Sequence, residues 1–98
     1  MITKENILSL LKSQKLELAR IGIRNVGLFG SYLRNAQSSE SDIDLLIDFE
    51  PGRESFDNLM AASDIFEDIF KDERFDVVTV NGLSPYIGPS ILDEVVYA

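Results

Sequence analysis

The hydrophobic positions of the chain follow two periods, about 3.6 residues in some stretches and about two in others, and so predict both helices and strands. From Thr3 to about Ile21 the apolar residues recur at helical spacing, and Thr3 is suited to cap the helix. We expect a break near residues 13–14 and an end at Gly22. This first stretch is therefore predicted as one interrupted helix.

The next two apolar stretches predict strands with a polar connection between them. Residues 25–29 predict a short, largely buried strand. Residues 32–35 are expected to form the first turn of a short helix, and the small polar residues 37–41 a loop. Residues 42–49 carry the clearest strand signal of the sequence, because apolar and polar residues alternate there. The alternation places on one face Ile43, Leu45, Ile47 and Phe49, and on the other Asp42, Asp44, Leu46 and Asp48.

The second half of the chain continues this alternation of helix and strand. Residues 51–52 end the preceding strand, and Ser55 can cap the helix that follows. The inward apolar stripe of that helix is predicted to consist of Phe56, Leu59, Met60, Ala62, Phe66, Ile69 and Phe70. Residues 75–80 predict a third strand, closed by the turn signal at 81–82.

The C-terminal stretch, residues 84–98, predicts a short helix followed by an apolar tail at 95–97. The helix residues expected to point inward are Ile87, Ile91 and Leu92. Helices thus alternate with at least three strands, which predicts an α/β (α+β) fold with one small mixed β-sheet packed against helices. A chain of 98 residues suits a single domain, 1–98, because domains typically contain about 50–200 residues.

Composition narrows the chemistry that this domain can perform. Hydrophobic residues make up 45% and charged residues 27%, which is typical of a folded domain. The sequence contains neither cysteine nor histidine, which excludes disulfides, thiolate or imidazole metal ligands and a histidine base. Catalysis would therefore depend on carboxylates, hydroxyls, amines or a bound metal.

Charge and hydropathy also limit the partners that we expect. The net charge of -8 disfavours direct binding to nucleic acid or to an anionic membrane. No apolar run approaches the roughly 20 residues that cross a bilayer, and the N-terminus lacks a signal-peptide core, so we expect a cytoplasmic protein. Residues 1–39 contain six basic and two acidic side chains, whereas residues 40–76 contain thirteen acidic and three basic. This acidic middle is either a solvated surface or a site that gains positive charge from a metal.

Two aspartates in the acidic middle are the strongest candidates for a metal site. Asp42 and Asp44 lie two positions apart on one predicted strand, so both carboxylates share a face with their Cα atoms about 7 Å apart. Their mutual repulsion would be relieved by one or two divalent cations, and Mg²⁺ or Mn²⁺ prefers such oxygen ligands. The alternative is that both form the polar side of an edge strand.

Gly30 and Ser31 are candidates for binding a phosphate. They follow a buried strand where a helix is expected to begin, and backbone N–H groups at such a position favour an anion. Glycine allows close approach of the backbone, and the serine hydroxyl adds a hydrogen-bond donor. Ten residues separate this pair from Asp42, enough for the chain to fold back and bring the two candidate sites together.

Together these residues resemble a known family. Gly30-Ser31, a gap of ten residues and Asp42-Ile43-Asp44 resemble the Gly-Ser-x10-Asp-x-Asp signature of the polymerase-beta-like nucleotidyltransferases. Residues 27–31 and 41–50 are similar to the minimal nucleotidyltransferase (MNT) antitoxins, and the resemblance spans nearly the whole chain. The sequence departs from the family pattern at Asn35, where many relatives have glycine.

The resemblance implies roles for individual residues. Family members usually add a third carboxylate from a later strand, a position that Asp76 matches, so that Asp42, Asp44 and Asp76 would together bind two Mg²⁺ ions, or Mn²⁺. Asp76 would also assist the attacking hydroxyl. Gly30 and Ser31 would bind the outer phosphates of a nucleotide.

Two further residues have weaker claims to a role. Arg34 either pairs with a phosphate or is a surface arginine. Asp48 shares the face of Asp44 but lies roughly 10 Å or more away along the strand, which favours a structural role.

The same resemblance implies a function and a partner. It predicts transfer of AMP from ATP to a hydroxyl, most simply that of a tyrosine, on a HEPN ribonuclease toxin, which the transfer would neutralise. A second hypothesis is a non-catalytic antitoxin that neutralises the toxin by steric occlusion, and a third is a regulatory nucleotide sensor. The sequence leaves open the donor base, the number of nucleotides transferred, and whether the protein forms homo- or hetero-oligomers.

Overall fold

The computed structural model describes residues 2–98. Its elements, in chain order, are α1 (Lys4–Ser13), α2 (Lys15–Arg20), β1 (Ile23–Phe29), β2 (Ile43–Phe49), α3 (Phe56–Phe70), β3 (Phe75–Thr79), the 3-10 helix η1 (Val80–Gly82), α4 (Gly88–Glu94) and β4 (Val96–Tyr97). None of the helices within residues 2–98 is both long and apolar enough to cross a membrane.

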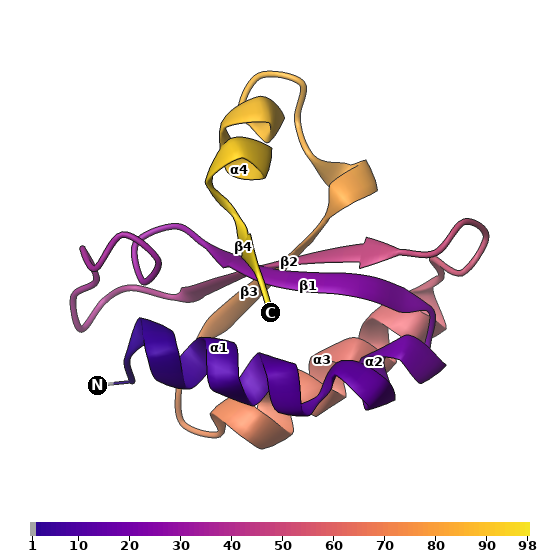
Figure 1. Cartoon of the computed structure of the whole chain (residues 1–98), viewed down its shortest axis with the longest axis horizontal. Helices are drawn as coiled ribbons and strands as arrows, with labels where there is room; N and C mark the ends of the chain where they lie inside the picture. The colour runs from indigo at the N-terminus through magenta and orange to yellow at the C-terminus, as the bar shows by residue number, and fades with distance from the viewer. Residues whose placement is uncertain (1) are drawn as a thin grey trace.

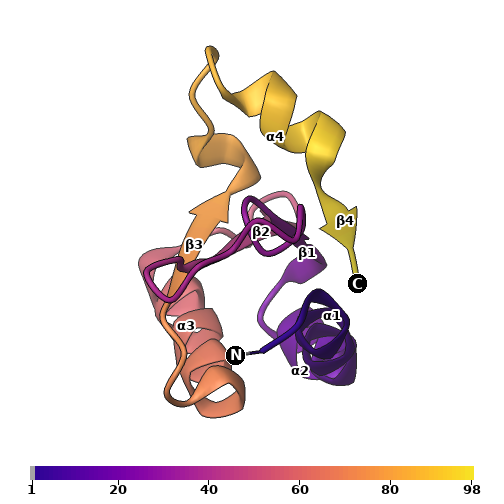
Figure 2. The same ribbon diagram turned by 90° about the vertical axis from the view of Figure 1, so that its left-hand side faces the viewer.

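A four-stranded mixed sheet organises the molecule, with the strand order β3-β2-β1-β4. β1 runs antiparallel to β2 and to β4, whereas β2 and β3 are parallel and are connected through α3. Figure 1 shows α1, α2 and α3 together on one face of the sheet, while α4 lies on the other side. Figure 2 shows the same arrangement after a turn of 90°. The predicted α/β (α+β) fold with a small mixed sheet is thus confirmed.

The alternation along β2 determines what each face of the sheet contains. Ile43, Leu45 and Ile47 are fully buried and belong to the core between the sheet and the helices. In the same core, the ring of Phe66 on α3 lies 6.0 Å from that of Phe75 on β3. Asp44, Leu46 and Asp48 point to the opposite face, as predicted. The polar positions of β2 therefore lie on the face that α1, α2 and α3 leave uncovered.

Both predicted helix caps are present. The side chain of Thr3 accepts a hydrogen bond from the Asn6 backbone N–H at 3.1 Å, and that of Ser55 accepts one from Asn58 at the same distance. The predicted break in the first helix is confirmed at Gln14, which separates α1 from α2.

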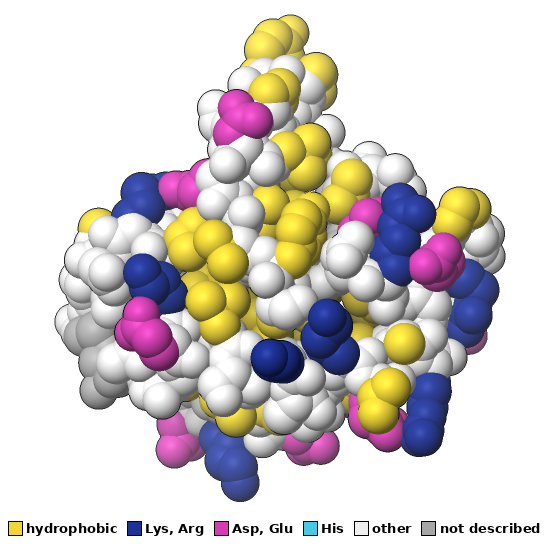
Figure 3. All heavy atoms as spheres, in the orientation of Figure 1, with side chains coloured by type: hydrophobic (Ala, Val, Ile, Leu, Met, Phe, Trp, Pro, Cys, Tyr) yellow, Lys and Arg dark blue, Asp and Glu magenta, His cyan; other side chains and the backbone are white. Residues whose placement is uncertain are grey.

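Several apolar residues expected to point inward are exposed instead. Phe56 and Met60 lie on the solvent side of α3, because its buried side follows Ala62, Phe66 and Phe70. On the C-terminal segment, Ile87 and Leu92 are also exposed. Figure 3 shows hydrophobic side chains over the part of the surface that α4 and β4 form. Our prediction of an inward-facing stripe was therefore wrong at these four positions.

The predicted strand boundaries also differ from the structure, since β1 begins at residue 23 instead of 25 and β2 at residue 43 instead of 42. The third strand ends at Thr79, and residues 80–82 form a 3-10 helix whose Gly82 N–H donates to the Thr79 hydroxyl. The apolar tail forms the edge strand β4. Gly27 on β1 makes this possible, because a Cβ there would lie 2.6 Å from Cγ2 of Val95. The missing side chain lets the C-terminal segment approach β1 closely.

Candidate functional site

The candidate site lies at one end of the sheet, where β1, β2 and β3 place three residues in one row. Asp44 of β2 is the register partner of Phe29 on β1 and of Asp76 on β3. Register partners on neighbouring strands point to the same face, so both carboxylates lie on the face that α1, α2 and α3 leave free. The sequence placed Asp44 and Asp76 in one site, and the sheet brings them to adjacent positions.

Gly30 lies against Asp44. A Cβ at Gly30 would be 2.0 Å from Oδ2 of Asp44, so only glycine lets the backbone and this carboxylate approach so closely. Gly30 also has φ +81°, a backbone conformation that other residues rarely adopt. The predicted phosphate cradle and one predicted metal ligand are therefore in direct contact.

A cavity of about 420 Å³ opens beside these residues. Its lining includes Gly30 and Arg34 from the segment after β1, Asp44 from β2, Glu94 from the end of α4, and the exposed side chain of Tyr86. Ser31, Asp42 and Asp76 lie outside this lining. The structure therefore brings Gly30 and Arg34 together with Asp44 and adds groups from the C-terminal segment.

Two of the acidic candidates are held by arginines. Asp42 lies one residue before β2, and its Oδ1 is 3.1 Å from Nε of Arg74, the residue that precedes β3. Asp48, at the far end of β2, is 2.9 Å from Nε of Arg24. Asp42 is thus close to Asp44 in sequence, but its carboxylate pairs with Arg74. The pairing of Asp48 with Arg24 supports the structural role that we expected for Asp48.

The segment after Gly30 is a turn, so our prediction of a short helix there was wrong. The Arg34 N–H donates to the Gly30 carbonyl, and the Ala36 N–H donates to the Ser31 carbonyl. Asn35 ends the turn with φ 56°, in the left-handed region that asparagine tolerates and glycine favours. This conformation is one that glycine, the residue expected here from the family resemblance, would adopt without strain. Anion binding here rests on individual N–H groups and Arg34, because no helix dipole contributes.

The electrostatics of the site are dominated by acidic groups. Burial raises the pKa of the Asp44 carboxyl, and the charges of Asp76, Asp42 and Glu94 raise it further, while Arg34 lowers it. Arg34 and the Gly30 N–H hold the pKa of the Glu94 carboxyl below its ordinary value, so Glu94 is ionised at neutral pH. The site carries more negative than positive charge and would attract a cation.

The donor set fits a divalent cation only in part. Asp44 and Asp76 offer oxygen ligands on adjacent strands, which is the chemistry that Mg²⁺ prefers. Among residues 2–98, however, no three acidic side chains are arranged so that they could hold a metal ion. Asp42 would have to leave Arg74 to become a third ligand. Asp44 and Asp76 are therefore the residues that would hold a metal first.

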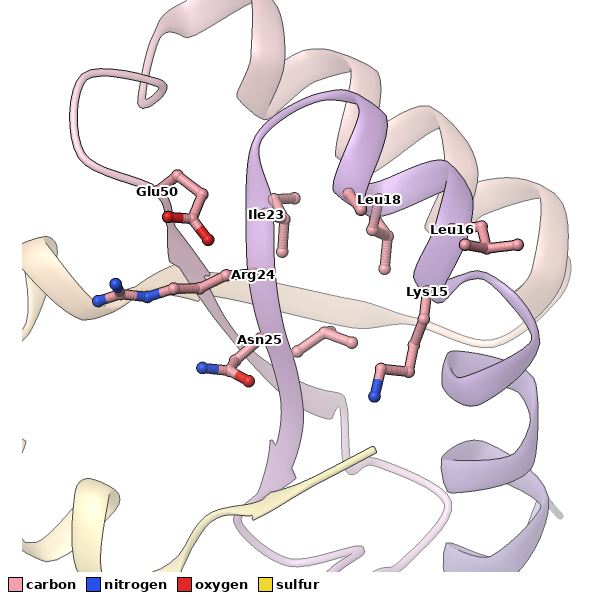
Figure 4. A pocket seen from close by; sticks show the side chains of 9 residues that line it. Lys15, Leu16, Leu18, Ile23, Arg24, Asn25 and Glu50 are labelled. Atoms are coloured by element: carbon pink, nitrogen blue, oxygen red, sulfur yellow. The ribbon is translucent and has the colours of Figure 1, made fainter.

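A second cavity, of about 360 Å³, lies elsewhere on the molecule. Figure 4 shows it between α2 and the start of β1, lined by Leu16, Leu18, Ile23 and neighbouring side chains. Its charged lining residues are Lys15, Arg24 and Glu50, and none of the three candidate aspartates reaches it. Of these two cavities, the one beside Asp44 is therefore the one that candidate site residues line.

Sequence reasoning missed Glu94. Its Oε2 accepts a hydrogen bond from the Gly30 N–H at 3.0 Å, and its Oε1 accepts one from Nη1 of Arg34. Sixty-four positions separate Glu94 from Gly30, and nothing in the local pattern of α4 indicates that the two meet. One signal was available, since Glu94 is a charged residue directly before the apolar tail.

Comparison with known proteins identifies the family of the chain. A family model described as polymerase beta, nucleotidyltransferase matches residues 5–97. The protein adenylyltransferase MntA of Thermococcus cleftensis is 38% identical over 100 residues, which cover 99% of this chain and 97% of that protein. A protein of Methanocaldococcus jannaschii, provisionally named a protein adenylyltransferase, is 35% identical over 79 residues, which cover 81% of this chain and 83% of that protein.

Structural comparison gives the same result. A solved structure provisionally described as a minimal nucleotidyltransferase matches with a TM-score of 0.81 and 28% sequence identity, and the match covers 97% of this chain and 95% of that chain. Since the family model and both relatives cover most of the chain, this protein belongs to the polymerase-beta nucleotidyltransferase family and has the fold of a minimal nucleotidyltransferase.

Proposed function

We propose that this protein is an antitoxin that transfers AMP from ATP to a tyrosine hydroxyl of a HEPN ribonuclease toxin in the cytoplasm and thereby neutralises it. The observation that carries the proposal is the row of Asp44 and Asp76 on adjacent strands, with the Gly30 backbone against Asp44. The name of the Thermococcus relative, a protein adenylyltransferase, supports a protein as the acceptor.

The site supplies a role for each residue in such a transfer. Arg34 and the Gly30 N–H would bind phosphate oxygens, with Ser31 next to them, because both residues line the cavity and their donors already bind the Glu94 carboxylate. Asp44 and Asp76 would hold Mg²⁺, and Asp42 would become a third ligand after its carboxylate leaves Arg74. The bound cation would offset the charge of the triphosphate. The sequence-based expectation of two such ions, or of Mn²⁺ in their place, is part of the same proposal.

The proposed reaction replaces one P–O bond by another and transfers one proton. The acceptor oxygen attacks the α-phosphorus of ATP, its proton passes to the Asp76 carboxylate, and the bond to the β-phosphate oxygen breaks to release pyrophosphate. Asp76 is exposed, so a hydroxyl on a docked protein can reach it. The chain therefore contributes orientation, a proton acceptor and phosphate-binding donors.

Mass spectrometry of the acceptor tests this proposal. The protein is incubated with ATP, Mg²⁺ and a purified HEPN-type ribonuclease as the candidate acceptor, and we expect the acceptor to gain the mass of one or more adenylate groups. Asp44→Asn and Asp76→Asn should each abolish the gain. Asp72→Asn is the matched control, because it removes the same charge at an exposed position after α3. An acceptor without adenylate, or an equal yield with all three variants, would contradict the proposal.

One observation favours steric occlusion as a second candidate function. Five large apolar side chains of the C-terminal segment are at least 41% exposed, namely Tyr86, Ile87, Leu92, Val96 and Tyr97. An exposed apolar surface of this kind suits a protein partner. If the double variant Asp42→Ala, Asp44→Ala protects cells from the toxin as well as the wild type does, occlusion is the mechanism.

A further inference from the structure

Glu94 occupies the two best anion-binding donors of the site. Its carboxylate accepts one hydrogen bond from the Gly30 backbone N–H and another from the Arg34 guanidinium. These are the donors that we assign to the phosphates of the nucleotide. A carboxylate and a phosphate oxygen compete for the same kind of donor, because both are anionic acceptors.

The surroundings of Glu94 support competition over a merely structural ion pair. Glu94 lines the same cavity as Asp44, and its negative charge helps to raise the pKa of the Asp44 carboxyl. A phosphate that enters this cavity would therefore find the Gly30 N–H and Arg34 already bonded to Glu94, and the negative charge of Glu94 would repel it. Both obstacles disappear when the Glu94 side chain turns away.

We propose that Glu94 is a built-in competitor of the nucleotide, whose carboxylate takes the place of a phosphate in the free protein and must leave when a triphosphate binds. The inference rests on the function proposed above, in which Gly30 and Arg34 bind phosphate. It adds a determinant of ligand choice, because a weakly charged anion displaces Glu94 less readily than a metal-bound polyphosphate does.

The departure of Glu94 is expected to be a side-chain rotation. Glu94 is the last residue of α4, and the chain after it is anchored on β1, where Leu28 pairs with Val96. A Cβ at Gly27 would lie 2.6 Å from Val95, so the backbone next to Glu94 is tightly packed. A movement of the whole segment would break these contacts, whereas rotation of the Glu94 side chain, which is 24% exposed, breaks only its hydrogen bonds to Gly30 and Arg34.

Calorimetric titration with Mg-ATP and with Mg-pyrophosphate tests the inference on the intact protein. Glu94→Gln keeps the size of the side chain but removes its charge, and we expect both ligands to bind about three- to tenfold more tightly, the range for loss of a partly exposed charged contact. Asp93→Asn is the matched control, because it removes one negative charge from the neighbouring exposed position of α4, and it should leave both affinities within about twofold of wild type.

Weaker or unchanged binding by Glu94→Gln would overturn the inference, and weaker binding would show that Glu94 positions the donors. An amide NMR spectrum gives a second readout, since pyrophosphate should shift the Gly30 N–H signal while the β4 signals stay in place. Loss of the β4 signals on ligand binding would refute the rotation.

The two proposals can fail separately in these experiments. If Glu94→Gln binds nucleotide more tightly but no acceptor gains adenylate, the competitor inference stands and the adenylyltransferase proposal is refuted. If the acceptor gains adenylate but Glu94→Gln does not bind nucleotide more tightly, the adenylyltransferase proposal stands and the competitor inference is refuted. If wild type and Glu94→Gln both fail to bind Mg-ATP at millimolar concentration, both proposals are wrong.

Discussion

Gly30 offers the sharpest test of how the site is built, because an alanine there would insert one atom between the backbone and Asp44. The new Cβ would lie 2.0 Å from Oδ2 of Asp44, far inside van der Waals contact. Since Oδ2 is at the end of a short side chain, the Asp44 carboxylate can turn away from the new Cβ without disrupting the core. Gly30→Ala should therefore fold but carry a displaced carboxylate.

The cost in stability can be separated from the cost in function with a matched variant. Gly30 and Gly52 have nearly identical φ angles, +81° and +80°, but a Cβ at Gly52 would meet no atom within 4 Å. Placing an L-residue in the left-handed region costs about 1–2 kcal/mol at either position. For a domain of this size, each kcal/mol lowers the melting temperature by about 4–8 °C. The two variants thus share the backbone strain and differ in the contact with Asp44.

Thermal unfolding and Mg-ATP titration should separate the two effects. We expect Gly52→Ala to melt at a lower temperature and to bind Mg-ATP like the wild type. Gly30→Ala should lose at least as much stability and bind Mg-ATP at least tenfold more weakly. Equal nucleotide affinity in both alanine variants would refute the idea that Asp44 depends on its contact with Gly30.

Three further predictions follow from the same structure. Asp76→Asn should lower the pKa of the Asp44 carboxyl, measured by carbon NMR titration without metal, because it removes a neighbouring negative charge; an unchanged pKa would mean that the pair is not coupled. Because folding raises this pKa, the contribution of Asp44 to stability decreases as pH rises above about 4, so the melting temperature of the wild type should decrease relative to that of Asp44→Asn over this range. Phe66→Ala should lower the free energy of unfolding by about 3–5 kcal/mol in urea, because the ring is fully buried; a loss below about 1 kcal/mol would contradict that burial.

Local pattern was sufficient wherever the answer depends on neighbours in sequence. The period-two alternation of residues 43–49 predicted the two faces of β2, and Ser55 predicted the start of α3. Pattern failed where distant contacts decide. The burial of Ile87 and Leu92 depends on how far α4 stands from the sheet, and β4 exists because Gly27 leaves space for it. The contact of Glu94 with Gly30 is of the same kind, since it depends on where β2, α3, β3 and η1 place α4.

The division between the two faces of β2 explains how so small a sheet can carry an acidic site. Ile43, Leu45 and Ile47 face the helices, and their burial stabilises the fold. The opposite face can therefore carry a charged residue such as Asp44. A shift of register by one residue would bury Asp44 in the core and expose the apolar side chains, an outcome that the pattern strongly disfavours. The fold thus fixes Asp44 beside Asp76 although their charges repel each other, and the repulsion becomes useful when a cation is present to relieve it.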